Sequence, residues 1–299
     1  MLNTSVKTRF AVSTIATSIR GGLTFLAAIF IARVLGPEDY GNYAFLLGTF
    51  IAMRNLLEMG TASAFYTFIS KKPQTFAFYM SYAIWQLFQF FIPFLIIAFI
   101  LPQSWLETIW VGQEKDLVLL AFSAIFFQQM LWPTMSNIGE SKRLTQRVET
   151  LNVIISVTYL FLVIGAWILE ILTVPLLFWI LLIQYFFALV FAFKVLSVFK
   201  IDKEPLNIRS MLREYLTYCL PLVISSWLGF AYEFADRWLL QNFGGSEEQA
   251  FYSVGYRFAT IGLVATTSMV KIFWKEIAEA QESKNFERMR TLYRRVSRF

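Results

Sequence analysis

The sequence predicts an all-α polytopic membrane protein with about eight transmembrane helices. Of its 299 residues, 57% are hydrophobic and only 15% are charged, whereas soluble domains carry about 25% charged residues. Apolar stretches long enough to cross a bilayer recur along the whole chain, and basic residues gather between alternate stretches. These features indicate that the chain folds in a bilayer rather than in water.

The expected spans are spaced evenly along the chain. A spanning helix needs about 20 mostly apolar residues. Segments that meet this requirement are 10–34, 43–66, 77–101, 117–137, 149–170, 174–197, 215–242 and 251–273. Interior prolines such as Pro93, Pro133 and Pro221 remove backbone donors, and we expect kinks near them.

The basic residues predict which ends of the helices are cytoplasmic. If the N-terminus lies inside, 20 of the 26 Lys and Arg residues fall in inner segments, as the positive-inside rule requires. The N-terminal stretch MLNTSVKTRF is basic and no small-residue cleavage site follows it. It therefore predicts a retained first helix with a cytoplasmic N-terminus, not a cleaved signal peptide.

A turn motif occurs twice, about 209 residues apart. The stretch IARVLGPEDYGNYAF places Gly36, Glu38, Asp39, Gly41 and Tyr43 at positions that match Gly245, Glu247, Glu248, Ala250 and Tyr252. Each copy joins an apolar helix to an aromatic-rich apolar helix through an acidic turn. Such a repeat predicts two related halves.

The repeat sets the expected domain organisation. Residues 1–198 are predicted to form a complete six-helix bundle, and 199–214 a cytoplasmic amphipathic connector. Residues 215–273 then supply the first two helices of a second bundle, and 274–299 a basic cytoplasmic connector. Six spans precede the inner connector and two follow it, so we expect a fragment that lacks a ninth and later helices.

Arginines within the spans are the expected binding residues. Arg20 and Arg54 each lie about ten residues into a span, roughly 15 Å deep. A central charge costs roughly 2.5–3.5 kcal/mol on insertion scales, so two of them favour a water-filled cavity. The alternative for Arg54 is an internal ion pair with Glu58 that helps insertion. Arg257 is a third candidate and lies nearer the outer end of its span.

The chemistry of these groups predicts an anionic ligand. Guanidinium groups donate parallel hydrogen bonds to phosphate or carboxylate oxygens, so the cavity suits a phosphate or diphosphate head group. Glu58, Glu233 and Asp236 are candidates for coupling to a cation or proton. Asp236 has the simpler alternative of pairing with Arg237.

The composition disfavours catalysis. The chain has no histidine and one cysteine, Cys219, which removes the commonest general base and any cysteine-based metal site. We predict no catalytic residues, no metal and no cofactor. Nucleic-acid binding is not expected either, because membrane topology accounts for the basic residues.

Three stretches carry a family resemblance. ARVLGPEDYGNYAF resembles the start of polysaccharide-biosynthesis membrane proteins, the O-antigen and exopolysaccharide flippases of the multidrug/oligosaccharidyl-lipid/polysaccharide exporter superfamily. YCLPLVISSWLGFAYEFADRWLLQNFGGSEEQAFYSVGYRFA looks like the opening of that family's second bundle. The tail FWKEIAEAQESKNFERMRTLYRRV is similar to the connector before its ninth helix.

The resemblance implies a transporter of the bacterial cytoplasmic (inner) membrane with two bundles and alternating access. Its substrate would be an undecaprenyl-diphosphate-linked oligosaccharide for O-antigen, capsule or exopolysaccharide, and a polymerase or synthase complex would be a possible partner. Arg20, Arg54 and Arg257 lie where related flippases contact the diphosphate. The alternatives are a multidrug or cation antiporter of the same superfamily and a non-transporting scaffold of a synthase complex. An enzyme is the weakest interpretation.

Overall fold

The computed structural model describes residues 6–71, 74–196, 208–260 and 286–296. The regular elements in those ranges are all helical, which confirms the predicted fold class. The chain divides into two compact units, Met1–Phe251 and Tyr252–Phe299, and each is described by itself. Much of the two expected connectors lies outside the described residues, so the predicted bundle boundaries stay predictions.

The first unit consists of helices joined by short connections. In chain order they are α1 (Val6–Glu58), α2 (Thr61–Lys71), α3 (Phe76–Leu95), η1 (Ile96–Ile100), α4 (Gln103–Ile109), α5 (Lys115–Phe126), η2 (Phe127–Leu131), α6 (Trp132–Ser141), α7 (Thr145–Ile168), α8 (Val174–Val195), α9 (Ile208–Leu239) and η3 (Leu240–Gly244). The η elements are π-helical turns. Residues 245–260 are also helical and cross into the second unit, where α11 (Phe286–Val296) is described too.

Six helices among the described residues are long and apolar enough to cross a bilayer. Two of them, Ser13–Glu58 and Arg213–Thr260, contain 46 and 48 residues. Measured along the helical chain at 1.5 Å per residue, each is about 70 Å, more than twice the roughly 30 Å hydrocarbon core. Each therefore holds two crossings, which agrees with about eight predicted spans. The eighth span is described only as far as Thr260.

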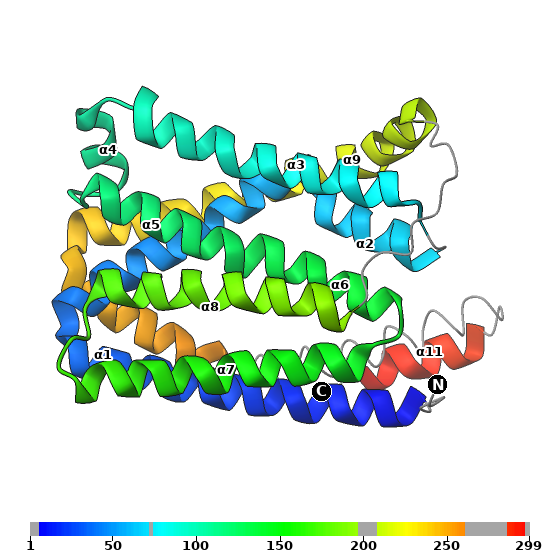
Figure 1. Ribbon diagram of the computed structural model, residues 1–299, viewed down its shortest axis with the longest axis horizontal. Helices are drawn as coiled ribbons and strands as arrows, with labels where there is room; N and C mark the ends of the chain where they lie inside the picture. The colour runs from blue at the N-terminus through cyan, green and yellow to red at the C-terminus, as the bar shows by residue number, and fades with distance from the viewer. Residues whose placement is uncertain (1–5, 72–73, 197–207, 261–285, 297–299) are drawn as a thin grey trace. The chain divides into compact units, whose positions relative to one another are not determined.

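A glycine interrupts each of these long helices at corresponding places in the repeat. Gly36 has φ 78° and ψ 174°, and Gly245 has φ 80° and ψ −178°. Positive φ is costly for L residues but accessible to glycine. Figure 1 shows α1 reversing direction part-way along its length. The repeat in the sequence thus corresponds to a repeated backbone turn.

The predicted span 43–66 is broken into two helices. α1 ends at Glu58, Met59 and Gly60 have positive φ (46° and 76°), and α2 begins at Thr61. A Cβ on Gly60 would lie 2.6 Å from Leu222 Cβ on α9, so glycine permits this close approach. The break places polar backbone and side chains between helices at the end of α1.

The π turns accompany two of the prolines expected to cause kinks. Pro93 lies near the end of α3, just before η1, and Pro133 follows η2 at the start of α6. Proline lacks the N–H that continues the α-helical ladder, and π turns accommodate such interruptions. Pro221 lies inside α9.

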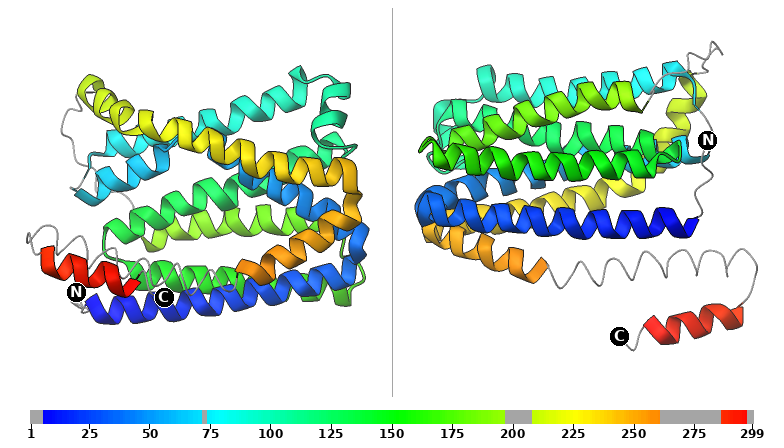
Figure 2. Two further views of the ribbon diagram at one scale, coloured as in Figure 1. Left: turned by 180° about the vertical axis from the view of Figure 1, so that it is seen from behind. Right: turned by 60° about the horizontal axis from the view of Figure 1, so that its bottom comes forward.

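Helix packing in the first unit encloses the broken end of α1. Helices α5, α8 and α7 lie side by side in Figure 1, and α9 packs against α1 and α2. Figure 2 shows α9 running across the opposite side of this unit. Buried apolar side chains of α2, α3, α6, α7 and α8 form a core near one end: Phe65, Ile69, Phe78, Tyr82, Trp132, Met135, Ile138, Val148, Leu151, Ile155 and Ala192, with Leu196 after α8.

Candidate functional site

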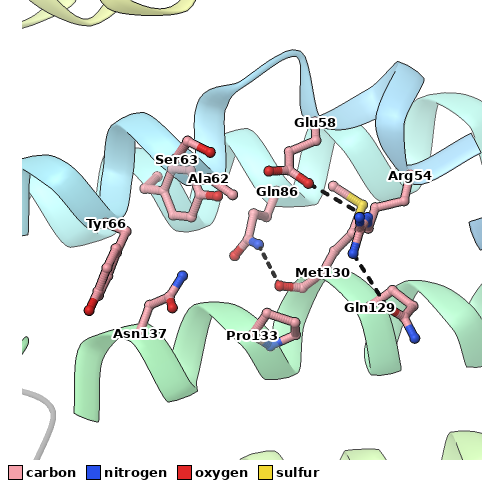
Figure 3. Close-up of a pocket in the computed structure, with 11 residues that line it drawn as sticks. Arg54, Glu58, Ala62, Ser63, Tyr66, Gln86, Gln129, Met130, Pro133 and Asn137 are labelled. Carbon is pink, nitrogen blue, oxygen red and sulfur yellow. Dashed lines mark hydrogen bonds and ion pairs between the residues drawn. The ribbon is translucent and has the colours of Figure 1, made fainter. Parts of the chain in front are cut away.

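A polar cavity of about 240 Å³ lies where α1, α2, α3, η2 and α6 meet (Figure 3). Amide, hydroxyl, aromatic and charged side chains contribute most of its wall. The lining residues are Arg54, Glu58, Ala62, Ser63, Tyr66, Tyr82, Gln86, Gln129, Met130, Pro133 and Asn137. Polar groups gathered inside spanning helices indicate a binding site or an aqueous pathway.

Arg54 is the central cation of this cavity. Its Nη1 donates to Gln129 Oε1 at 3.5 Å and its Nη2 to Asn55 Oδ1 at 3.4 Å. Its Nε lies 3.7 Å from Glu58 Oε2 and has no hydrogen-bond partner although it is buried. Strong charged hydrogen bonds measure about 2.7–2.9 Å. The guanidinium donors are therefore weakly engaged by the protein.

Several neighbours of Arg54 are fixed by hydrogen bonds. Gln86 Nε2 donates to Thr134 Oγ1 at 2.8 Å and to the Met130 carbonyl at 3.2 Å, and Figure 3 shows it beside the ion pair. Gln89 donates to the Leu57 carbonyl, close to the break in α1. Amide side chains between helices hold them in register inside a membrane. The cavity wall is thus built by cross-helix bonds.

A second cavity of about 170 Å³ adjoins the first on the α9 side. Arg54, Glu58 and Ser63 line both cavities, and α9 adds Leu222, Ser225 and Ser226 to the second. Asn55 Nδ2 donates to Glu233 Oε2 on α9 at 3.2 Å. The structure therefore brings Arg54, Glu58 and Glu233 together through Asn55. The predicted pairing of Arg54 with Glu58 is present within a cavity, so it does not exclude the binding interpretation.

Arg20 lies elsewhere in the first unit. It is not among the lining residues of either cavity, and it lies in the neighbourhood of Tyr185 on α8. The Tyr185 hydroxyl accepts a hydrogen bond from Gln128 Nε2 at 3.5 Å. Gln128 precedes Gln129, the partner of Arg54, on η2. A shared role for Arg20 and Arg54 stays a prediction.

The remaining predicted residues lie outside the two cavities. Asp236 is exposed, near Glu233 on α9, and is not among the lining residues. Arg257 belongs to the second unit, where Thr260 Oγ1 donates to its carbonyl oxygen at 2.7 Å. Its predicted contact with the ligand therefore stays a prediction.

Sequence reasoning missed the neutral polar residues of the site. Asn55, Gln86, Gln129 and Asn137 contact or surround the ion pair, yet no charge marks them. The sequence does mark such residues, because amides inside apolar runs such as FFQQML are costly unless they find hydrogen-bond partners.

The fold and site define a polytopic, all-α membrane protein with a polar cavity among its helices that holds the Arg54–Glu58 ion pair. A profile of the polysaccharide biosynthesis protein family matches residues 6–273, which is most of the chain. The chain belongs to that family, as the resemblance predicted. Neither curated proteins nor solved structures gave a match.

Proposed function

We propose that this chain is part of a flippase that moves undecaprenyl-diphosphate-linked oligosaccharides across the bacterial inner membrane. Its N-terminus is cytoplasmic in this proposal, and the exported units serve O-antigen, capsule or exopolysaccharide assembly. The function is transport, not catalysis. Family membership supports polysaccharide biosynthesis in a membrane, and the substrate and mechanism are the proposed part.

The observation that carries the proposal is the Arg54 guanidinium. It is half-buried in a polar cavity between spanning helices, and its described contacts measure 3.4–3.7 Å. A diphosphate supplies oxygens that accept shorter, charge-assisted bonds from such a group. Gln129 and Asn55 then act as neutral partners that orient the guanidinium toward the ligand.

The size of the site determines which part of the substrate it holds. The cavity of about 240 Å³ is somewhat smaller than the roughly 300–1,000 Å³ of typical small-molecule sites. In this proposal it takes the charged head group and leaves most of the oligosaccharide outside. Arg54 therefore binds the diphosphate, and Asn137, Ser63 and Tyr66 lie where they bind the adjoining sugar. The polyprenyl chain stays in the bilayer.

Contacts at one end of the first unit support alternating access. The Asn42 Oδ1 atom accepts hydrogen bonds from Gln113 Nε2 (2.9 Å), Gln241 Nε2 (3.2 Å) and Ser246 Oγ (2.8 Å). Trp238 Nε1 donates to the Thr108 carbonyl at 2.9 Å. The predicted topology puts this end outside, so we propose that these bonds close the outer face in one state of the cycle.

Binding of undecaprenyl diphosphate to the chain in lipid nanodiscs tests the proposal. We expect saturable binding that undecaprenol, which lacks the diphosphate, does not displace. Arg54→Lys should weaken binding because lysine cannot donate in parallel. Arg33→Ala is the matched control, since Arg33 is exposed on the same helix. Equal binding by wild type and Arg54→Ala, with both folded, contradicts the assignment.

The same assay separates the alternatives. A multidrug or cation antiporter would bind lipophilic cations in preference to undecaprenyl diphosphate. A scaffold would bind neither and would instead co-purify with a polymerase or synthase. The transport step itself is measured by surface polysaccharide in cells whose copy of this protein carries the substitutions.

Glu58 provides a test of whether a neighbouring carboxylate competes with the ligand for Arg54. Its carboxylate competes with the ligand for Arg54 in the observed arrangement. Glu58→Gln should therefore raise affinity for undecaprenyl diphosphate, by about tenfold or less, since exposed or half-exposed pairs contribute about 1 kcal/mol at most. Glu233→Gln and Asp236→Asn should act more weakly, because neither contacts Arg54 directly. Lower affinity in Glu58→Gln would rule out competition.

A further inference from the structure

A large groove lies between α2 and α9, at the end of the first unit where α9 begins. Its volume of about 710 Å³ falls within the roughly 300–1,000 Å³ of typical small-molecule sites. The predicted topology puts this end of α9 on the cytoplasmic side. The groove therefore combines apolar, hydroxyl and charged groups near the inner surface. Its lining residues are Phe68, Arg213, Glu214, Thr217, Tyr218, Pro221 and Leu222.

Cross-helix contacts hold the two sides of this groove together. Phe68 on α2 stacks on Tyr215 of α9 with ring centroids 5.7 Å apart, and it meets Tyr218 edge to face at 6.4 Å. The Tyr218 hydroxyl and Thr67 Oγ1 share a hydrogen bond of 3.1 Å. The Tyr215 hydroxyl donates to the Thr61 carbonyl. The groove thus has a wall built by packed and hydrogen-bonded side chains from both helices.

One row of residues on α9 leads from the groove to the partners of Arg54. Residues four apart on a helix lie nearly one above the other. Asn55, which accepts from Arg54, donates to the last residue of this row at 3.2 Å. The row is therefore mostly polar or small from the inner end of α9 to the cavities. Its members are Arg213, Thr217, Pro221, Ser225, Gly229 and Glu233.

Leu222 lies between the groove and the inner cavities. Its side chain lines both the groove and the second cavity, which Arg54 also lines. A Cβ on Gly60 would lie 2.6 Å from the Leu222 Cβ, so Leu222 packs against the break after α1. Arg213 precedes Leu222 by nine residues, about 14 Å along the helix axis. An apolar side chain thus separates an outer arginine from an inner one.

We propose that the groove is the entrance by which the phosphate-bearing head group of the lipid substrate reaches Arg54 from the cytoplasmic side. Arg213 is its first binding residue and Leu222 its constriction. Arg213 is exposed in the groove, and a guanidinium donates parallel hydrogen bonds to phosphate oxygens. Glu214 lines the same groove, and its opposite charge keeps binding at Arg213 weak, as suits an entrance. This inference rests on the proposed function.

The entrance is tested without substrate, on the purified 299-residue chain in nanodiscs of zwitterionic lipid. Cys219 is the one cysteine of the chain, so Ser226→Cys in a Cys219→Ala background reports access to the second cavity. Leu222→Trp should slow its reaction with a water-soluble methanethiosulfonate by at least about tenfold, or about 1.4 kcal/mol in activation free energy. Leu222→Ala should accelerate the reaction, because it widens the constriction.

The matched control for the constriction is Leu220→Trp. Leu220 is 73% exposed on the same helix and is not among the lining residues of the groove, so this variant should react like the background. The two Leu222 variants act in opposite directions, which separates blockage from misfolding. Equal rates in the background, Leu222→Trp and Leu222→Ala would overturn the entrance, whether or not the chain binds undecaprenyl diphosphate.

The charge of Arg213 is tested with the same cysteine. Arg213→Gln should slow an anionic, sulfonate-bearing reagent by about fivefold or less, since a unit charge about 4 Å away contributes about 1 kcal/mol in water. It should not slow a cationic, trimethylammonium-bearing reagent. Arg33→Gln, exposed on α1, is the control and should change neither rate. An unchanged rate for the anionic reagent in Arg213→Gln would remove Arg213 from the entrance.

The identity of the entering lipid is tested at Thr217→Cys, which lines the groove. Undecaprenyl diphosphate should protect this cysteine from the anionic reagent, and phosphatidylglycerol at the same concentration should protect it less. Equal protection would make the groove a general phospholipid site and not an entrance. If the Leu222 variants change access as expected but undecaprenyl diphosphate neither protects nor binds, the proposed function fails while the route to the cavity stands.

Discussion

The two halves of α1 each carry an arginine at mid-span depth, Arg20 in the first and Arg54 in the second. Their surroundings differ. The half before Gly36 contains Arg20 and packs against α7, where Phe30 meets Trp167 edge to face at 5.3 Å. Its apolar side chains Ile15 and Leu26 are 61% and 58% exposed, as expected for residues that face lipid. It therefore forms one wall of the first unit.

The half after Gly36 lies inside the helical unit. Phe45 and Leu46 are fully buried, and Phe50 packs on Trp110 and Phe122. A Cβ on Gly48 would overlap the Arg237 side chain of α9, so this half is tightly enclosed. The comparison separates two mid-membrane charges of the same predicted depth: Arg54 lines cavities among several helices, and Arg20 does not.

The largest expected effect is a difference in ligand affinity between the alanine variants of the two arginines. Arg54→Ala should lower affinity for undecaprenyl diphosphate by at least about 30-fold, since losing one partner of a buried charged contact costs roughly 2–5 kcal/mol. Arg20→Ala should change it by less than about tenfold, because Arg20 lines neither cavity. Equilibrium binding in nanodiscs measures both. If Arg20→Ala is as damaging as Arg54→Ala, the two halves share one site.

Gly41→Ala should produce the next largest effect, on stability. A Cβ there would overlap the Ser246 carbonyl group, and overpacking of this kind costs about 1–3 kcal/mol. The control is Gly21→Ala in the first half of α1, where a Cβ meets nothing within 4 Å. Thermal unfolding in detergent measures the difference. Equal melting temperatures would mean that Gly41 does not pack on Ser246 in solution.

Gly36→Ala and Gly245→Ala should each lower stability by a similar amount, about 1–3 kcal/mol, because this backbone region is essentially restricted to glycine. Gly36 has φ 78° and ψ 174°, and Gly245 has φ 80° and ψ −178°. The Cβ of either residue meets no atom within 4 Å, so the effect isolates backbone strain. Thermal unfolding in detergent again provides the measurement. A neutral effect at one position alone would show that the two repeated turns differ in solution.

The smallest expected effect compares adjacent residues of η2. Gln129→Leu removes a partner of Arg54 and should lower affinity for undecaprenyl diphosphate by up to about tenfold, since one hydrogen bond contributes roughly 0.5–1.5 kcal/mol. Gln128→Leu removes the bond to Tyr185 near Arg20 and should leave the affinity unchanged. Equal losses in the binding assay would contradict the separation of the two arginines.

The helical class and the approximate spans were predictable because apolar length and basic residues between spans depend on local sequence. The repeated turn was predictable for the same reason, since Gly36 and Gly245 match within their own segments. The π turns and the break at Gly60 were not expected. They depend on how prolines and neighbouring helices such as α9 meet the local backbone.

The candidate site was only partly predictable. Arg54 and Glu58 are one turn apart on one helix, so their pairing follows from helical spacing. Gln129 lies 75 residues away in the sequence, and no local pattern connects it with Arg54.

The sequence by itself determined that this chain is a helical membrane protein of the polysaccharide biosynthesis family with charges inside its spans. Those properties depend on composition and short-range spacing. Only the tertiary structure decided which charges are enclosed together, because burial and charge pairing depend on helices far apart in the chain. It placed Arg54 and Glu58 on two adjoining cavities and joined Glu233 to Arg54 through Asn55. It left Arg20 outside both cavities.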